Sequence, residues 1–142
     1  MPRGPRLDAP GVVHHVMGRG VGQQLVFLDD ADREDFLARL ERLVDDGALT
    51  VYAWALLGNH FHLLVRTGNQ PLGRSMRRLL TGYACRFNRR HGRVGHLFQN
   101  RYKSIICEEE PYFLRLVRYI HRNPLKHEVL RDASELDEYP YT

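Results

Sequence analysis

Two β-rich segments joined by only two residues are the feature that most limits how this chain can fold. Residues 49–57 are rich in β-branched and aromatic residues and apolar on both faces, as in a central strand. Gly58 and Asn59 lead from this segment directly into a second one, residues 60–66. Because parallel strands need a long crossover connection, so short a link predicts an antiparallel hairpin. The chain is therefore expected to build an antiparallel sheet.

The second segment carries two histidines separated by one apolar residue. Side chains alternate between the two faces of a strand, so His60 and His62 are expected on one face. Phe61, Leu63 and Val65 then point the other way, into a core. Two imidazoles on one face are half of a metal site, although buried histidines often only pack. The pair by itself leaves both roles open.

Apolar periodicity predicts the remaining elements. Strands are expected at residues 12–19, 24–28, 49–57, 60–66, 97–98 and 102–107, and helices at residues 32–46, 71–91 and 111–123. Gly47 is the expected stop of the first helix. Strands and helices alternate too irregularly for a parallel, doubly wound sheet. We therefore predict an α+β fold, an antiparallel sheet with helices packed on one face, as a single domain over residues 1–142.

The second half of the chain is strongly basic. Residues 71–131 hold 14 Arg or Lys against four Glu, a balance of +10 in a chain whose net charge is +4, so the rest carries −6. In the second helix the arginines gather away from the apolar stripe, with no acidic residue interspersed: Arg74, Arg77, Arg78, Arg86, Arg89 and Arg90. The guanidinium group suits phosphate oxygens, which favours a helix that faces nucleic acid over one that is merely solvated.

The third helix places a tyrosine at the edge of its apolar stripe. At about 100° per residue, Tyr119 projects roughly 110° from the centre of the stripe, beside Arg115 and one turn before Asn123. An accessible phenol near an arginine and an amide oxygen is suited to chemistry at a divalent cation. Tyrosine is equally common as a packing residue at such a boundary. Spacing alone leaves both interpretations open.

Five segments, taken in order, carry a resemblance to a known family: residues 14–20, 27–33, 58–65, 97–104 and 118–124. On these segments the chain resembles the single-tyrosine HUH transposases of the insertion sequence 200-like group, in particular the REP-associated tyrosine transposase (RAYT) branch. The resemblance implies a ferredoxin-like (RRM-like) HUH transposase fold. One departure is Gly58, where a proline is expected before the Asn-His pair.

The resemblance also implies roles for individual residues. His60, His62 and Asn123 would hold a divalent cation, Mg²⁺ or Mn²⁺. Tyr119 would be the nucleophile that cleaves and rejoins single-stranded DNA near hairpins through a 5′-phosphotyrosine intermediate. We expect DNA contacts from basic residues of the second half: Arg74, Arg77, Arg78, Arg86, Arg89, Arg101, Lys103 and Arg115. Members of the family differ in whether they dimerise, so a homodimer stays open.

Two other functions fit the same residues. One is a protein that binds DNA hairpins without cleaving them, and the other is a histidine-metal hydrolase that uses water as its nucleophile. The sequence contains no signal-peptide pattern and no apolar run of membrane-spanning length. We therefore expect an intracellular protein without a membrane partner, located in the cytoplasm and associated with the nucleoid.

Overall fold

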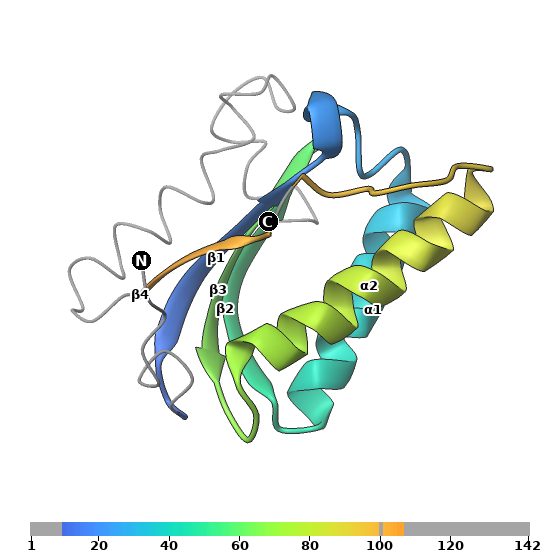
Figure 1. Ribbon diagram of the computed structural model, residues 1–142. Helices are drawn as coiled ribbons and strands as arrows, with labels where there is room; N and C mark the ends of the chain where they lie inside the picture. The colour runs from blue at the N-terminus through green and yellow to red at the C-terminus, as the bar shows by residue number, and fades with distance from the viewer. Residues whose placement is uncertain (1–9, 100, 107–142) are drawn as a thin grey trace, which may run out of the picture.

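The computed structural model describes residues 10–99 and 101–106, and these form one sheet and two long helices (Figure 1). The elements follow in the order β1 Val13–Arg19, a short 3-10 helix Val21–Gln23, α1 Asp30–Asp45, β2 Leu49–Leu56, β3 His60–Thr67, α2 Leu72–Arg90 and β4 Lys103–Ile106. The helix expected at residues 111–123 lies outside the described residues.

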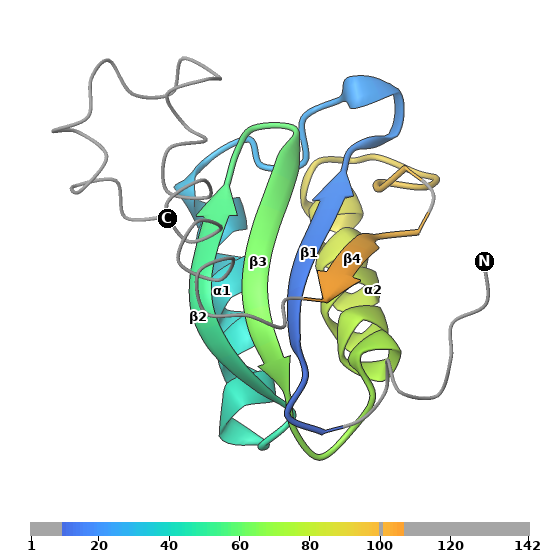
Figure 2. The same cartoon turned by 90° about the vertical axis from the view of Figure 1, so that its left-hand side faces the viewer.

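The sheet has four antiparallel strands in the order β2-β3-β1-β4 (Figure 2). Both described helices pack on the same face of this sheet (Figure 1). The chain order β-α-β-β-α-β, with β1 and β3 at the centre, is the ferredoxin-like arrangement. The predicted α+β class with helices on one face is confirmed. Neither described helix is both long enough and apolar enough to cross a lipid bilayer.

The expected hairpin forms, but its first strand lies elsewhere in the sheet than its composition indicated. The amide N–H of Leu57 donates to the carbonyl of His60 at 2.9 Å and closes the two-residue turn. β2 is an edge strand of the described sheet and not a central one. Apolar residues on both faces of a strand indicate that both faces are covered by other parts of the protein. They carry no information about which strands lie on either side of it.

The strand expected at residues 24–28 does not form: the segment is a loop in which Val26 and Phe27 are buried, whereas Leu25 and Leu28 are exposed. The N–H groups of Val26 and Phe27 both donate to the carbonyl oxygen of Gly58, at 2.8 and 3.1 Å. The hydroxyl of Tyr83 donates to the carbonyl of Val26. The side chains of Val26 and Phe27 are buried in the core. Val26 and Phe27 therefore cover one end of the core, and their N–H groups are satisfied without a strand partner.

Local signals set the ends of α1 close to the predicted 32–46. The carboxylate of Asp29 accepts from the N–H of Asp32 at 3.1 Å and caps the first turn. At the other end Gly47 adopts φ +77°, a conformation that glycine takes without steric cost, and the helix stops. α2 likewise matches the predicted 71–91, beginning after Pro71 and ending at Arg90.

The core between helices and sheet is built around aromatic rings. Phe36 of α1 lies 5.2 Å from Phe61 of β3 between ring centroids, and Tyr83 of α2 lies 5.3 Å from Phe36. Phe98 contacts Phe61 edge-on at 5.8 Å. Because Phe61 is fully buried among these rings, β3 cannot slip by one residue without moving its whole apolar set to the other face. The aromatic core therefore fixes which way the neighbouring histidines point.

Candidate functional site

His60 and His62 lie on the face of the sheet opposite the helices, as the strand periodicity predicts. Their ring centroids are 5.1 Å apart and the ring planes are nearly perpendicular, at 82°. His62 is 4% exposed, whereas His60 is half-buried. Phe61 between them is fully buried on the helix side. The expectation that the two imidazoles share one face is confirmed.

A third histidine, which sequence reasoning left without a role, joins this pair. His15 of β1 places its Nε2 3.1 Å from Nδ1 of His62, and the two rings stack with centroids 5.3 Å apart at 24°. His15 is 3% exposed, and this burial lowers its pKa below the ordinary 6.5 because the charged form is poorly solvated. His15 is therefore a neutral imidazole at neutral pH.

The strand register brings His15 to His62. Leu64 is the direct cross-strand partner of His15, and Met17 is that of His62, so the two histidines are diagonal neighbours on one face. The sequence carried one usable signal, the alternation of β1 that puts His15 and Met17 on the same face. It could not supply the β1–β3 register, which sets the partner of each side chain.

His60 is held from its own turn. Its Nδ1 lies 2.8 Å from Oδ1 of Asn59, and because an amide oxygen only accepts, Nδ1 carries the proton in this contact. The lone pair of the His60 ring is then on Nε2. Asn59 thus sets the tautomer of the first histidine.

Three arginines of α2 pair with carboxylates, contrary to the expectation that this helix presents unpaired cations. Arg78 contacts Asp46 at 3.1 Å, and Arg86 contacts Asp35 at 3.4 Å. Arg90 forms ion pairs of 2.7 Å with both Asp29 and Asp32. All these acids lie in α1 or at its ends, and α1 runs antiparallel to α2. α2 itself contains no acidic residue, so these pairs cannot be predicted from the sequence of the helix.

Five of the predicted DNA-binding residues are exposed and make no ion pair within the described residues: Arg74, Arg77, Arg89, Arg101 and Lys103. Arg101 lies over the ring of Tyr102, 5.4 Å from its centroid. The predicted contact Arg115 lies outside the described residues. These exposed cations, and not the whole arginine face, are available to a polyanion.

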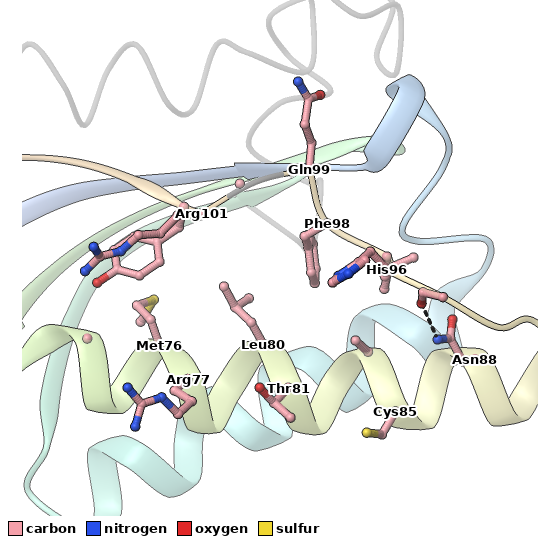
Figure 3. Close-up of a pocket in the computed structure, with 16 residues that line it drawn as sticks. Met76, Arg77, Leu80, Thr81, Cys85, Asn88, His96, Phe98, Gln99 and Arg101 are labelled. Carbon is pink, nitrogen blue, oxygen red and sulfur yellow. Dashed lines mark hydrogen bonds between the residues drawn. The ribbon is translucent and has the colours of Figure 1, made fainter.

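A groove of about 780 Å³ between α2 and residues 95–99 and 101–102 has two of these cations in its lining. Figure 3 shows Met76 and Leu80 pointing from α2 toward the facing segment, from which Phe98 points back. Arg77 and Arg101 lie at the same end of this groove (Figure 3). An apolar floor with guanidinium groups at its edge suits a nucleic acid strand, whose bases are flat and whose backbone is anionic.

The family described as Transposase IS200 like matches residues 12–123 of this chain. The chain belongs to this family. The match takes in both histidines of β3 and the basic helix α2. No curated protein sequence matches the chain.

Two solved structures show the same fold as this IS200-like transposase. The structure of a REP-associated tyrosine transposase bound to a REP hairpin has a TM-score of 0.75 at 17% identity, covering 99% of this chain and 81% of that one. The crystal structure of a protein described as a transposase, from Deinococcus radiodurans R1, has a TM-score of 0.53 at 16% identity. It covers 86% of this chain and 97% of that one.

The transposase's histidine face fits part of a divalent metal site. Imidazole nitrogens are good ligands for divalent cations, and His60 and His62 place two imidazole rings on one face. Within residues 10–99 and 101–106, no group of three or more His, Cys, Asp or Glu is arranged to hold a metal. The predicted third ligand, Asn123, and the predicted nucleophile, Tyr119, lie outside the described residues.

Proposed function

We propose that this IS200-like transposase is a metal-dependent enzyme that cleaves and rejoins single-stranded DNA near hairpins, and that it belongs to the REP-associated branch. One observation carries the proposal. In a member of this family, His60 and His62 share one sheet face, each with its Nδ1 within hydrogen-bond distance of a neighbouring side chain. Imidazoles held in this way are typical of ligands at a working metal centre.

His60, His62 and Asn123 are the proposed ligands of a Mg²⁺ or Mn²⁺ ion. When bound, such an ion stabilises negative charge on the phosphoryl oxygens of the scissile phosphate. The two histidines come from a rigid central strand, so the protein loses little conformational entropy when the site is assembled. Asn123 and Tyr119 are one helical turn apart in sequence, which would bring the third ligand and the nucleophile to the same phosphate.

Tyr119 is the proposed nucleophile. Its phenolic oxygen attacks phosphorus, the bond from phosphorus to the 3′-oxygen breaks, and the proton lost by the phenol is balanced by one gained at the departing 3′-oxygen. The products are a 5′-phosphotyrosine link and a free 3′-hydroxyl. Because the phosphodiester energy stays in the new bond, attack by another 3′-hydroxyl rejoins DNA without ATP.

Hairpin DNA is the proposed substrate. One solved structure of the same fold is that of a REP-associated tyrosine transposase bound to a REP hairpin. In the present chain the exposed arginines of α2 and the groove beside them would take the DNA backbone and its unpaired bases. With this substrate the protein would act in the cytoplasm at the nucleoid, and a homodimer stays a prediction.

The decisive test is capture of the covalent intermediate. The full-length protein is incubated with Mn²⁺ and hairpin oligonucleotides that carry randomised single-stranded flanks, and the products are separated on a denaturing gel. A protein-linked DNA band is expected for the unsubstituted chain and for the matched control Tyr112→Phe. The band is expected to disappear in Tyr119→Phe and in EDTA.

The same gel separates the other candidate functions. Cleaved DNA without a protein-linked band, surviving in Tyr119→Phe, would identify a hydrolase with water as its nucleophile. Hairpin binding that persists in EDTA with no cleavage of any flank would identify a DNA-binding protein without catalysis. Loss of the adduct in Tyr112→Phe with retention in Tyr119→Phe would overturn the assignment of the nucleophile.

A further inference from the structure

We infer that His15 is a positioning residue that holds His62 in the tautomer that can bind a metal. The inference rests on the proposed role of His62 as a ligand. His15 would not touch the metal or the DNA. It would act through Nδ1 of His62.

The contact between the two rings is specific in geometry and shielded from water. Nε2 of His15 lies 3.1 Å from Nδ1 of His62, which is within hydrogen-bond distance. The side chains are 3% and 4% exposed. A hydrogen bond between buried groups is not readily replaced by one to water, so removing either partner leaves a polar atom unsatisfied. The contact therefore constrains His62 more strongly than a surface contact of the same length.

Only one direction of this hydrogen bond allows His62 to bind a metal. If Nδ1 of His62 donates to Nε2 of His15, the lone pair of the His62 ring is on Nε2. If His15 donates instead, Nε2 of His62 carries the proton and cannot coordinate a cation. In the first arrangement His15 accepts at Nε2 and carries its own proton on Nδ1.

His60 supports this direction. Its Nδ1 donates to Oδ1 of Asn59, an atom that can only accept. With His15 as acceptor, both imidazoles of the strand carry their proton on Nδ1 and their lone pair on Nε2. Both rings can then coordinate a cation through Nε2. Partners of this kind orient metal-binding histidines and raise their basicity.

The stacked rings offer a second explanation, in which His15 only packs against His62. Two substitutions separate packing from hydrogen bonding. His15→Phe keeps a ring of similar size and removes the acceptor. His15→Gln removes the ring, while its Oε1 can reach the position of the lost Nε2 and accept from His62. Leu64→Val is the matched control, because Leu64 is the cross-strand partner of His15, fully buried, and makes no side-chain hydrogen bond.

The test measures Mn²⁺ affinity of the full chain by calorimetry and the tautomer of His62 by ¹⁵N NMR of the metal-free protein. His15→Phe is expected to bind Mn²⁺ about 10–100 times more weakly, the usual effect of removing such a partner. It is also expected to lose the Nδ1–H tautomer of His62. His15→Gln is expected to keep that tautomer and to bind within a few-fold of the unsubstituted chain, as is Leu64→Val.

Four outcomes contradict the inference. Unchanged Mn²⁺ affinity in His15→Phe would overturn it, and so would Mn²⁺ binding in His15→Gln that is as weak as in His15→Phe. A His62 that carries its proton on Nε2 in the unsubstituted protein would reverse the direction of the hydrogen bond. Absence of Mn²⁺ binding by the unsubstituted protein, alone and with hairpin DNA, would instead overturn the proposed metal dependence and the positioning role with it.

Discussion

One glycine of β1 leaves room for the ring of Phe61, the residue between the two histidines of β3. Gly18 of β1 is the cross-strand partner of Phe61, and a Cβ at this position would lie 2.5 and 2.6 Å from two carbons of the Phe61 ring. The ring lies across β1 and reaches Phe98 on the far side. His60 and His62 flank Phe61 in sequence, so a change that moves the backbone at Phe61 also moves the two histidines.

We therefore expect Gly18→Ala to lower the free energy of unfolding by about 1–3 kcal/mol, the usual cost of overpacking a core. Urea denaturation followed by circular dichroism measures this change. In Gly18→Ala/Phe61→Leu the added methyl group has room, so the combined cost should be smaller than the sum of the two single costs. Additive costs would contradict the clash.

Gly73→Ala is the control for the backbone effect of replacing glycine. The added Cβ at Gly73, in the first turn of α2, would meet its nearest neighbour, the hydroxyl of Tyr102, at 3.6 Å, an ordinary contact. Alanine is also the better helix former. The variant should be neutral or slightly more stable than the unsubstituted chain. A loss like that of Gly18→Ala would mean that glycine replacement as such causes the effect.

At the scale of the element, α2 carries two kinds of arginine. One side faces α1, where Arg78, Arg86 and Arg90 pair with carboxylates. Arg74, Arg77 and Arg89 are exposed and make no ion pair within the described residues. A cation already paired with a carboxylate gains less from a phosphate, because that pairing has to be given up first. The surface of α2 that we propose binds DNA is thus smaller than the number of arginines in the helix suggests.

Arg77→Gln is accordingly expected to weaken hairpin binding several-fold. It should also reduce the slope of log Kd against log salt concentration by about 0.7–0.9, the loss of one phosphate contact. The control is Arg86→Gln, which leaves Asp35 paired with Arg39 at 2.9 Å and should change the slope little. Fluorescence anisotropy at several salt concentrations measures both. An equal effect of the two variants would contradict the division of α2 into two faces.

At the scale of the whole molecule, one cluster ties the start of α1 to the end of α2. The carboxylate of Asp32 is 3% exposed and accepts from the N–H of Leu28, from Arg90 and from His91. Asp29 contributes two further oxygens to Arg90. The hydrogen bonds from Arg90 hold the pKa of the Asp29 carboxyl well below the ordinary 3.8. The contacts that join the two helix ends thus depend on carboxylate charges that are lost at low pH.

The sign of the pH effect follows from this lowered pKa. Because protonation is harder in the folded state, the contribution of Asp29 to stability is complete above the unfolded pKa near 3.8 and falls away as pH drops below it. Asp29→Asn keeps a capping oxygen for the N–H of Asp32 and removes the charge. Its melting temperature should therefore fall less steeply than that of the unsubstituted chain between pH 5 and pH 2, as followed by circular dichroism.

Glu41→Gln is the control for the general effect of removing an acid from α1. Glu41 is exposed and makes no ion pair among the described residues. The melting temperature of its variant should therefore fall as steeply at low pH as that of the unsubstituted chain. If the melting temperature of Asp29→Asn falls as steeply at low pH as that of Glu41→Gln, the cluster does not cause the loss of stability in acid.

Local sequence determined most of the secondary structure and the common face of two candidate ligands, His60 and His62. A period of two put His60 and His62 on one face, and a period of 3.6 gave both described helices to within two residues at each end. The two-residue link made the hairpin, and Gly47 ended α1. These features depend on neighbours in sequence, so a reader of the chain can predict them.

Tertiary structure alone decided the features that join distant segments. Residues 24–28 form a loop and not a strand, because Gly58 and Tyr83 satisfy backbone groups of Val26 and Phe27, and the contact from Tyr83 spans 57 residues. Arg90 finds Asp29 across 61 residues, and His15 finds His62 across 47. Such partners are chosen by the packing of helices and the register of strands, and no local period encodes either. The two metal-binding candidates were therefore visible in the sequence, whereas the histidine that orients one of them was not.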